Sequence, residues 1–371
     1  MNFLQKFLIF SVLLFAMAAN AQNSNPACAL KKAQAEMLSG LKNVDDGLLY
    51  ELDYQYDYDL DRLIENDVTS VPSFVKYAVT KMMNPFKAVF HIKSLLPACS
   101  AFQAVTPDGD IIYARNFDFT FSEPSASVLV RTQPENGYAS ISMAPFSLVG
   151  KKQGDLDDGK SDNSLLIVAP YLLMDGMNEK GLAVSVLYLD GEGTEQYDPD
   201  KHDIMTLSAM RIMLDKAADT DEALALMQQY NMFADKTKSE IPHSYHFLIS
   251  DAKGHSVVLE YIHNEGDKSW TMSPVEAKYV TNAYLNEGWQ HIGHGYDRYE
   301  KVKDAYEAKN GVFTEEEAMQ LLKEVSQTAT AEKTSNTQWS AVYNLTKKTV
   351  KICMARDYDK VLEFEIIKRQ Y

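Results

Sequence analysis

The chain has 371 residues, of which 46% are hydrophobic, and its formal net charge is -16. This composition is typical of a globular protein, and the acidic balance without any basic cluster excludes the usual nucleic-acid-binding surface. Without its leader the chain is long enough for one large domain or two ordinary ones.

The first residues have the pattern of a secretory signal peptide. Lys6 gives a positive start, residues 7–17 form an almost unbroken apolar run, and Ala19-Asn20-Ala21 offers small residues for a signal peptidase. The apolar run is short for a membrane span, and no later stretch reaches the about 20 residues that a span needs. We expect a signal peptide over residues 1–21 and a secreted or periplasmic protein.

Three cysteines are present, Cys28, Cys99 and Cys353. An odd number in an exported protein indicates one disulfide and one thiol that is kept free. Cys28 also lies too far beyond the apolar run to be the lipid-carrying cysteine of a lipoprotein.

The segment between the signal peptide and Cys99 differs from the rest of the chain. Residues 29–41 and 71–96 have the apolar spacing of helices, the second interrupted at Pro85. The Tyr- and Asp-rich stretch 49–60 fits either an extended segment or a loop. We expect a helical segment without catalytic groups of its own.

From Cys99 onward the pattern changes to strands and intervening helices. Residues 100–105 and 111–116 form a predicted hairpin around a turn that contains Pro107 and Gly109. Helices are expected at about 204–216, after the N-cap Asp219, and after a capping box at Thr314. Further strands are expected over 127–131, 138–143, 182–189, 245–250, 256–261, 339–344, 350–354 and 361–367. This order predicts an α+β fold with two sheets and helices outside them.

The predicted hairpin brings Arg115 and Asp118 back beside Cys99. A guanidinium group favours the thiolate, the reactive form of cysteine. If the chain is cut between Ala98 and Cys99, the new α-amine lies on the same residue as the nucleophile and has a pKa near about 8, suited to a base. The same residues fit equally well with a buried core cysteine beside a surface ion pair.

Four blocks, in the same order, give the chain a resemblance to a known family. They are Cys99 with Arg115-Asn116-Phe117-Asp118, then residues 175–186, then Thr281-Asn282, and finally Arg298. Together they resemble the choloylglycine hydrolase group of N-terminal-nucleophile (Ntn) hydrolases. This group includes bile salt hydrolases, penicillin V acylases, acid ceramidase and N-acylethanolamine acid amidase.

The resemblance implies a four-layer αββα sandwich over residues 99–371, preceded by the helical leading segment. Residues 22–98 would then be a propeptide or a retained segment like the α-subunit of acid ceramidase. Because Cys99 would have to stay free, Cys28 and Cys353 are the one pair left for a disulfide, which would tie the two parts together.

The resemblance also implies a role for each matching residue. Cys99 attacks the amide carbonyl, and its own α-amine takes and returns the proton. Asp118 orients that amine, and Arg115 supports the thiolate. Asn282 donates its side-chain amide to the oxyanion. Arg298 holds Asp118 or Asn282 in place.

Tyr188 stands where bile salt hydrolases usually have Asn and penicillin V acylases usually have Tyr. With the long leading segment, this favours an exported amidohydrolase that cleaves linear N-acyl amides through a thioester acyl-enzyme. The alternatives are a conjugated bile salt hydrolase, an acyltransferase, and a catalytically silent binding protein on the same fold. The expected partner is a small-molecule amide, and homo-oligomerisation stays open.

Two histidine pairs, His243/His246 and His291/His294, have the spacing of metal ligands. Neither pair has a third ligand nearby in the sequence. We therefore expect no metal and no other cofactor.

Overall fold

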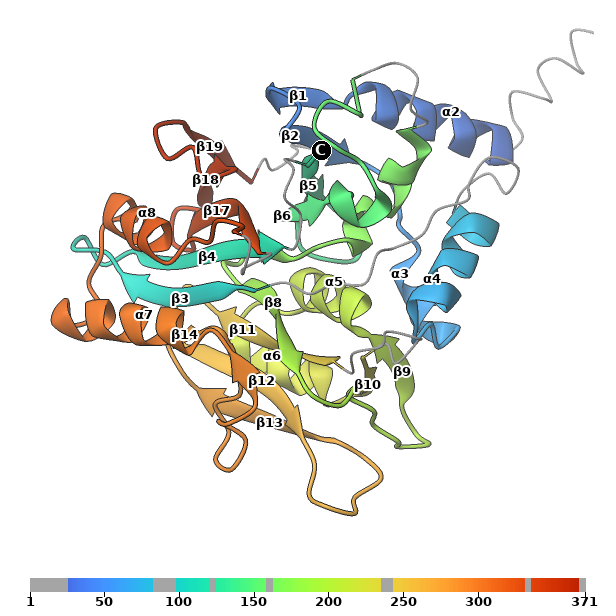
Figure 1. Cartoon of the computed structure of the whole chain (residues 1–371). Helices are drawn as coiled ribbons and strands as arrows, with labels where there is room; N and C mark the ends of the chain where they lie inside the picture. Colours follow the sequence, from blue (N-terminus) through green and yellow to red (C-terminus); the bar gives the residue numbers. More distant parts are fainter. Residues whose placement is uncertain are drawn as a thin grey trace, which may run out of the picture.

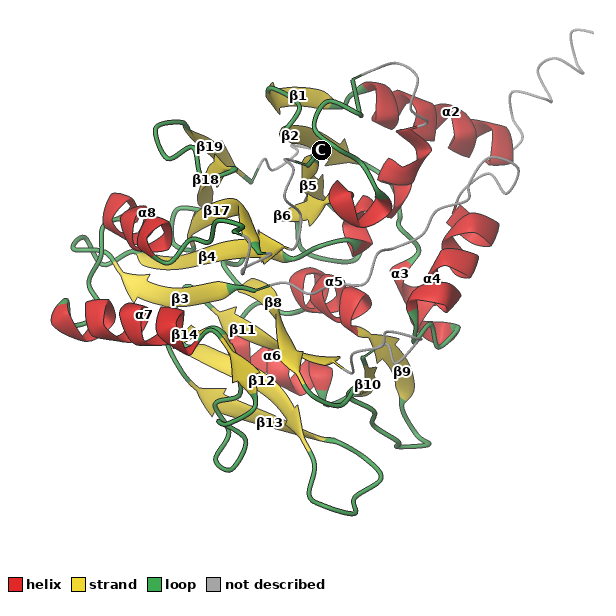
Figure 2. Ribbon diagram, in the orientation of Figure 1, coloured by secondary structure: helices red, strands yellow, loops and turns green. Residues whose placement is uncertain are grey.

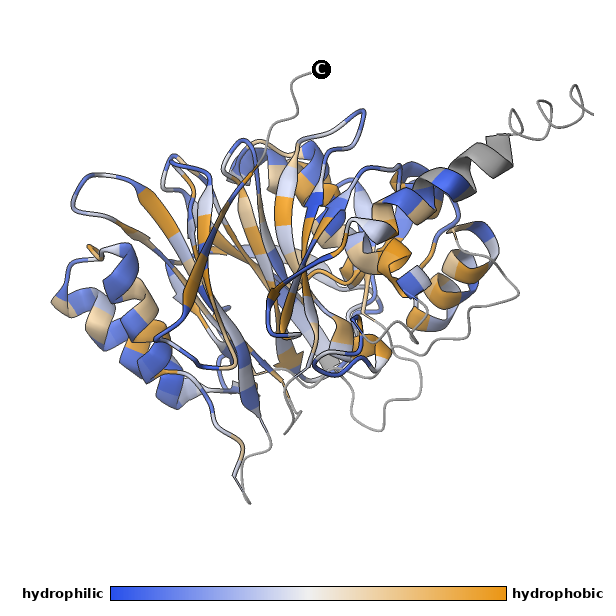
Figure 3. Ribbon diagram, turned by 90° about the horizontal axis from the view of Figure 1, so that it is seen from above, coloured by the Kyte–Doolittle hydropathy of each residue, from blue (hydrophilic) through white to orange (hydrophobic). Residues whose placement is uncertain are grey.

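The computed structural model describes residues 26–82, 98–119, 125–157, 163–234, 243–330 and 335–366. Two large β-sheets lie at its centre (Figure 1). Apolar side chains from both sheets share one buried core. In Figure 3 hydrophobic residues run along the central strands, whereas polar residues follow the loops and the outer helix faces.

The larger sheet has nine strands in the order β1-β2-β5-β6-β7-β8-β11-β12-β13. Its neighbours are antiparallel except β2 and β5, which are parallel. The strands are β1 (Lys42–Asp45), β2 (Leu49–Tyr54), β5 (Ser127–Thr132), β6 (Ser140–Pro145), β7 (Asp175–Asn178), β8 (Ala183–Asp190), β11 (His243–Ser250), β12 (Ser256–Ile262) and β13 (Thr271–Glu276).

The smaller sheet has six strands in the order β14-β3-β4-β17-β18-β19, all antiparallel. They are β14 (Tyr279–Val280), β3 (Ser100–Val105), β4 (Ile111–Phe119), β17 (Asn336–Asn344), β18 (Thr349–Met354) and β19 (Val361–Glu365). Two short pairs complete the described strands: β9 (His202–Met205) with β10 (Tyr230–Phe233), and β15 (Asn282–Ala283) with β16 (Gly293–His294).

Helices cover the outer face of each sheet (Figure 2). Helices α5 (Thr206–Lys216) and α6 (Thr220–Met227) pack on the larger sheet, and α7 (Tyr296–Ala308) and α8 (Glu315–Glu324) pack on the smaller one. The predicted four-layer αββα order is therefore confirmed. The expected caps are present, because Asp219 accepts the Glu222 N–H and Thr314 forms a capping box with Glu317.

The leading segment contains the expected helices together with two strands. Its helices are α2 (Pro26–Ser39), α3 (Leu60–Glu65), α4 (Val71–Tyr77) and a π-helical turn (Ala78–Met82), but β1 and β2 lie between them and extend the larger sheet. Leu49, Tyr50, Leu52 and Tyr54 of β2 are buried. The stretch is a strand because β5 offers it a full parallel partner, from Leu49 opposite Ser127 to Tyr54 opposite Thr132.

The predicted disulfide is also not formed in this structure. Cys353 is a free, buried thiol on β18. It packs in a second core between the smaller sheet and the helices α7 and α8. Helix α2, which carries Cys28, packs instead against β2 of the larger sheet, and the Cys28 side chain lies outside the described residues.

The predicted signal peptide, residues 1–21, lies outside the described residues as well. Within the part of the chain that the structure describes, no helix has both the length and the apolarity needed to cross a bilayer.

Candidate active site

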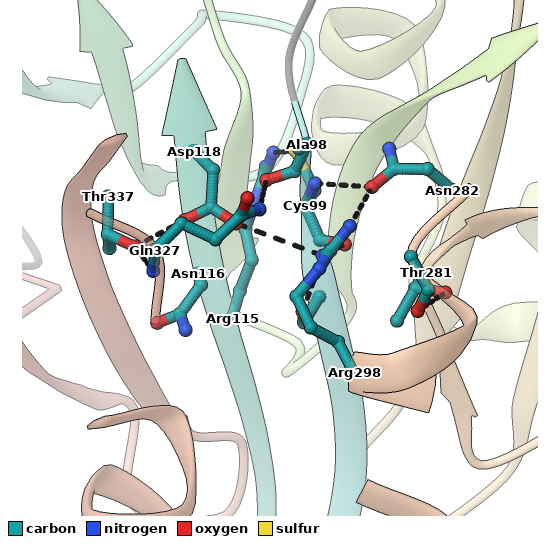
Figure 4. A network of polar contacts seen from close by, with 12 residues as sticks. Ala98, Cys99, Arg115, Asn116, Asp118, Thr281, Asn282, Arg298, Gln327 and Thr337 are labelled. Carbon is teal, nitrogen blue, oxygen red and sulfur yellow. Dashed lines mark hydrogen bonds and ion pairs between the residues drawn. The ribbon is translucent and has the colours of Figure 1, made fainter. Parts of the chain in front are cut away.

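Cys99 directly precedes β3, at the point where the hairpin strand β4 returns (Figure 4). The register places Ser100 opposite Asn116 and Ala101 opposite Arg115. Cys99 is completely buried, with Ala98 still attached in front of it. The candidate nucleophile thus lies inside the core, in a chain that continues through Ala98.

Arg115 lies against the thiol. Its Nη2 is 3.1 Å from Cys99 Sγ and also donates to the carbonyl oxygen of Val186 at 2.9 Å. Its Nη1 donates to the Met174 carbonyl and forms an ion pair of 3.1 Å with Asp175. Burial raises the pKa of the Cys99 thiol, and Arg115 opposes that shift without cancelling it. In this buried setting the thiol form is favoured over the thiolate.

Asp175 is a site residue that sequence reasoning did not single out. Its carboxylate accepts hydrogen bonds from the Trp339 indole at 2.9 Å and the Tyr343 hydroxyl at 2.5 Å, besides the ion pair with Arg115. Burial raises the pKa of the Asp175 carboxyl, and these donors oppose the shift. A signal was available, because Asp175 opens the second block of the family resemblance.

The peptide bond between Ala98 and Cys99 is held at both of its polar atoms (Figure 4). The Cys99 N–H donates to Asn282 Oδ1 at 2.6 Å. On the other side, Gln327 Nε2 lies 3.5 Å from the Ala98 carbonyl oxygen. The Ala98 N–H donates to the Asp118 carbonyl at 3.1 Å, which fixes the residue before the bond.

Arg298 connects the predicted site residues. Its Nη2 donates to Asn282 Oδ1 at 2.9 Å, and its Nη1 donates to Ser100 Oγ at 2.8 Å and to the Cys99 carbonyl. Nη1 also lies 3.8 Å from Asp118 Oδ2. Arg298 therefore contacts both residues that it was predicted to hold.

Asn282, on β15, presents its amide oxygen to Cys99 and Arg298. Because both of these groups are donors, the oxygen must face them. The amide nitrogen donates to the Tyr188 carbonyl at 2.8 Å. The oxyanion role of this nitrogen stays a prediction, while the oxygen has a position from which it would hold an α-amine.

The carboxylate of Asp118 is completely buried and bound on both oxygens. Oδ1 accepts from the Thr337 hydroxyl, and Oδ2 accepts from Gln327 Nε2 at 2.8 Å. Burial raises the pKa of Asp118, and Arg298 and these two donors oppose the shift. Thr337 and Gln327 were missed by sequence reasoning, since no motif marks residues brought here by the pairing of β17 with β4.

The Tyr188 ring is buried, 1% exposed. It lies edge-on to Tyr245, its partner across β8 and β11, with ring centroids 6.2 Å apart, and 6.1 Å from the ring of His294. Burial raises the pKa of its hydroxyl. In the uncut chain, Tyr188 thus reaches Cys99 through its backbone carbonyl and Asn282, and its ring packs in the interior.

The histidine pairs have other partners. Buried His246 contacts Glu260 at 3.2 Å and the Thr281 carbonyl at 2.8 Å, and His294 contacts Asp190 at 2.8 Å. Among the residues that the structure describes, no group of three or more His, Cys, Asp or Glu side chains is arranged to hold a metal ion. The His243 side chain lies outside those residues.

Comparison with known proteins shows which family this part of the chain resembles. The sequence profile of the linear amide C–N hydrolases, choloylglycine hydrolase family, matches residues 99–268. Residues 99–268 of the chain are therefore similar to this family. The match begins at Cys99, so the leading segment lies outside it.

A penicillin V acylase from Pectobacterium atrosepticum is 30% identical over 131 residues, which cover 32% of this chain and 34% of that protein. The chain thus matches about a third of the length of this family relative. Two mutants of the conjugated bile acid hydrolase from Clostridium perfringens superpose with TM-scores of 0.52 and 0.51 at 17% identity, over 72% of this chain and 92% of theirs. These structures share the fold of the chain.

Proposed function

We propose that the protein is an exported cysteine amidohydrolase that cleaves the linear amide bond of N-acyl substrates, after a cut between Ala98 and Cys99 frees its nucleophile. The observation that carries this proposal is the setting of Cys99. Its sulfur lies 3.1 Å from a buried guanidinium, and its nitrogen lies 2.6 Å from an amide oxygen that would hold an α-amine. A buried structural cysteine needs neither contact.

Maturation would be an acyl shift within the chain. The Cys99 sulfur bonds to the Ala98 carbonyl carbon, the Ala98–Cys99 C–N bond breaks, and the thiol proton passes to the departing nitrogen, which becomes the α-amine. Water then hydrolyses the thioester, which leaves a carboxylate on Ala98 and a thiol on Cys99.

Turnover would repeat the chemistry on a substrate amide. The α-amine, held by Asn282 Oδ1, takes the thiol proton and returns it to the leaving amine. Arg115 stabilises the thiolate. Arg298 holds Asn282 in position through a hydrogen bond and Asp118 through an ion pair. The acyl group leaves Cys99 when water attacks the thioester.

We further propose that the leading segment stays bound after the cut. Strand β2 lies inside the larger sheet, between β1 and β5, so its release would remove two strands. Side chains hold it too: Tyr58 donates to Asp215 at 2.5 Å, and Tyr54 donates to the Ile167 carbonyl at 2.9 Å. Because such buried bonds are costly to break, it would be a second subunit and not a discarded propeptide.

For the substrate, we propose an N-acyl amide with a linear or aryl acyl chain, in preference to a conjugated bile salt. The supporting observation is Tyr188, whose carbonyl accepts a hydrogen bond from the Asn282 amide and whose ring is buried against Tyr245. The penicillin V acylase relative points in the same direction.

Intact mass of the purified secreted protein, together with hydrolysis assays, tests the proposed function. We expect a chain that begins at Cys99, and hydrolysis that a thiol alkylator abolishes and a chelator leaves unchanged. Cys99→Ala should remain uncut and inactive. Cleavage that persists in Cys99→Ala without added protease, or hydrolysis restored by zinc after chelation, would contradict the mechanism.

The same preparation separates the substrate classes. Values of kcat/KM for fatty acyl amides, phenoxyacetyl amides and glycine- or taurine-conjugated bile acids are compared side by side. A preference of tenfold or more for the bile acids, about 1.4 kcal/mol in transition-state binding, would make the protein a bile salt hydrolase. Faster transfer to an added amine than to water would make it an acyltransferase, and an uncut chain without activity would make it a binding protein.

A further inference from the structure

Gln327 occupies a place in the site that no part of the proposed turnover requires. It lies between α8 and β17. Two hydrogen bonds join its backbone to Thr337: the Gln327 N–H donates to Thr337 Oγ1 at 2.8 Å, and the Gln327 carbonyl accepts the Thr337 N–H at 3.0 Å. Thr337 lies opposite Asp118 in the pairing of β17 with β4. The side chain of Gln327 is therefore projected from a rigid base.

The side-chain nitrogen of Gln327 faces two acceptors, Asp118 Oδ2 at 2.8 Å and the Ala98 carbonyl oxygen at 3.5 Å. The Ala98 carbonyl oxygen can only accept a hydrogen bond, so the nitrogen and not the oxygen of the Gln327 amide must point at this pair. One amide group thus bridges the buried carboxylate and the carbonyl that maturation has to break.

We propose that Gln327 is the oxyanion donor of the maturation step. This inference rests on the proposed cut between Ala98 and Cys99. When the Cys99 sulfur bonds to the Ala98 carbonyl carbon, negative charge develops on the carbonyl oxygen, next to the Gln327 N–H. Asn282 Oδ1 holds the departing nitrogen on the opposite side of the same peptide.

The length of the contact fits this role. At 3.5 Å the Gln327 amide adds little to the uncut peptide, and it gains most when the oxygen becomes charged and tetrahedral. An interaction that strengthens only in the transition state lowers the barrier. After the cut, Ala98 leaves this position and Gln327 keeps its hydrogen bond to Asp118. Gln327 would therefore act as an oxyanion donor only before the cut, and as a donor to Asp118 both before and after it.

The test compares two rates in the full-length protein. Maturation is followed by intact mass as the uncut chain disappears, and turnover is measured per mole of chain that begins at Cys99. In Gln327→Met, we expect maturation to slow by about 100-fold, the usual effect of losing one oxyanion donor. Turnover should fall by at most about tenfold, because only the bond to Asp118 is lost.

Thr337→Val is the comparison variant: it removes the other side-chain donor to Asp118 and the acceptor of the Gln327 N–H, and it leaves the Gln327 side chain in place. It should change both rates by a similar factor. Gln320→Met, on the exposed face of α8, should process like the wild type. If Gln327→Met is poorly folded, Gln327→Leu removes the donor with a different apolar side chain.

Maturation of Gln327→Met at the wild-type rate would overturn the inference. Equal slowing of maturation and turnover in Gln327→Met would overturn it as well, because Gln327 would then act through Asp118 alone. A wild-type chain that never cuts itself contradicts the proposed maturation instead, so the two failures are distinguishable.

Discussion

Two buried arginine–aspartate pairs in this molecule have nearly the same chemistry and different surroundings. Arg115 pairs with Asp175 at 3.1 Å, and Arg211 pairs with Asp215 at 2.6 Å. Both arginines are completely buried, and each lies over an aromatic ring, Phe117 for Arg115 and Tyr58 for Arg211.

The difference lies in what the remaining donors and acceptors contact. Arg115 Nη2 reaches the Cys99 sulfur, whereas Arg211 Nη2 donates to Ser140 Oγ at 2.7 Å, and Asp215 accepts from Tyr58 of the leading segment. The first pair contacts the candidate nucleophile, and the second joins the leading segment to the rest of the chain. A buried ion pair is therefore no sign of an active site until its neighbours are known.

The sharpest test of this comparison removes each guanidinium in turn. Arg115→Met and Arg211→Met both leave a buried carboxylate without its cation, so each should lower the free energy of unfolding by about 3–5 kcal/mol. Arg115→Met alone should also slow maturation by about 100-fold or more, because the thiolate loses the charge that favours it. Denaturant titration gives the first effect and intact mass over time gives the second. Equal maturation rates in the two variants would remove Arg115 from the chemistry.

The pH dependence of maturation tests the state of the thiol beside the first pair. Burial raises the pKa of Cys99 above its ordinary value, so the thiolate fraction increases with pH throughout the neutral range. If the thiolate attacks Ala98, the maturation rate should rise about tenfold for each pH unit from 6 to 8.5. A plateau that begins near pH 7 would mean that Arg115 outweighs burial.

The smallest expected effect concerns the second pair. Tyr58→Phe removes the hydrogen bond to Asp215 and leaves the two contacts from Arg211 in place. It should reduce the free energy with which the leading segment binds the rest of the protein by about 1 kcal/mol, and it should leave turnover unchanged. Retention of that segment on gel filtration across a urea series measures this, with Tyr56→Phe as the control. A change in turnover as large as the change in retention would mean that the two pairs are coupled.

The sequence was informative where the contacts are local. Cys99, Arg115 and Asp118 lie in one hairpin, and its turn of five residues fixes the register that brings them together. The fold class followed from the alternation of strands and helices together with the family resemblance. The helix caps at Asp219 and Thr314 were visible for the same local reason.

The parts that escaped prediction depend on long-range pairing. Thr337 meets Asp118 through the pairing of β17 with β4, and Gln327 follows because it is bonded to Thr337. Strand β2 was ambiguous because its partner β5 begins only at Ser127. The expected Cys28–Cys353 bond rested on cysteine number alone, which carries no information on where β18 and α2 lie.

The parallel pairing of β2 with β5 affects how the protein could refold after the proposed cut. Before it, residues 49–54 and 127–132 belong to one chain, and their association during folding is a loop closure within one molecule. After it they would belong to two chains, so reassembly from the unfolded state becomes a bimolecular reaction whose extent depends on protein concentration. The cut that creates the nucleophile would then also make unfolding irreversible at low protein concentration. A dilute, unfolded mature enzyme would lack the covalent link that first brought the strands of its largest sheet together.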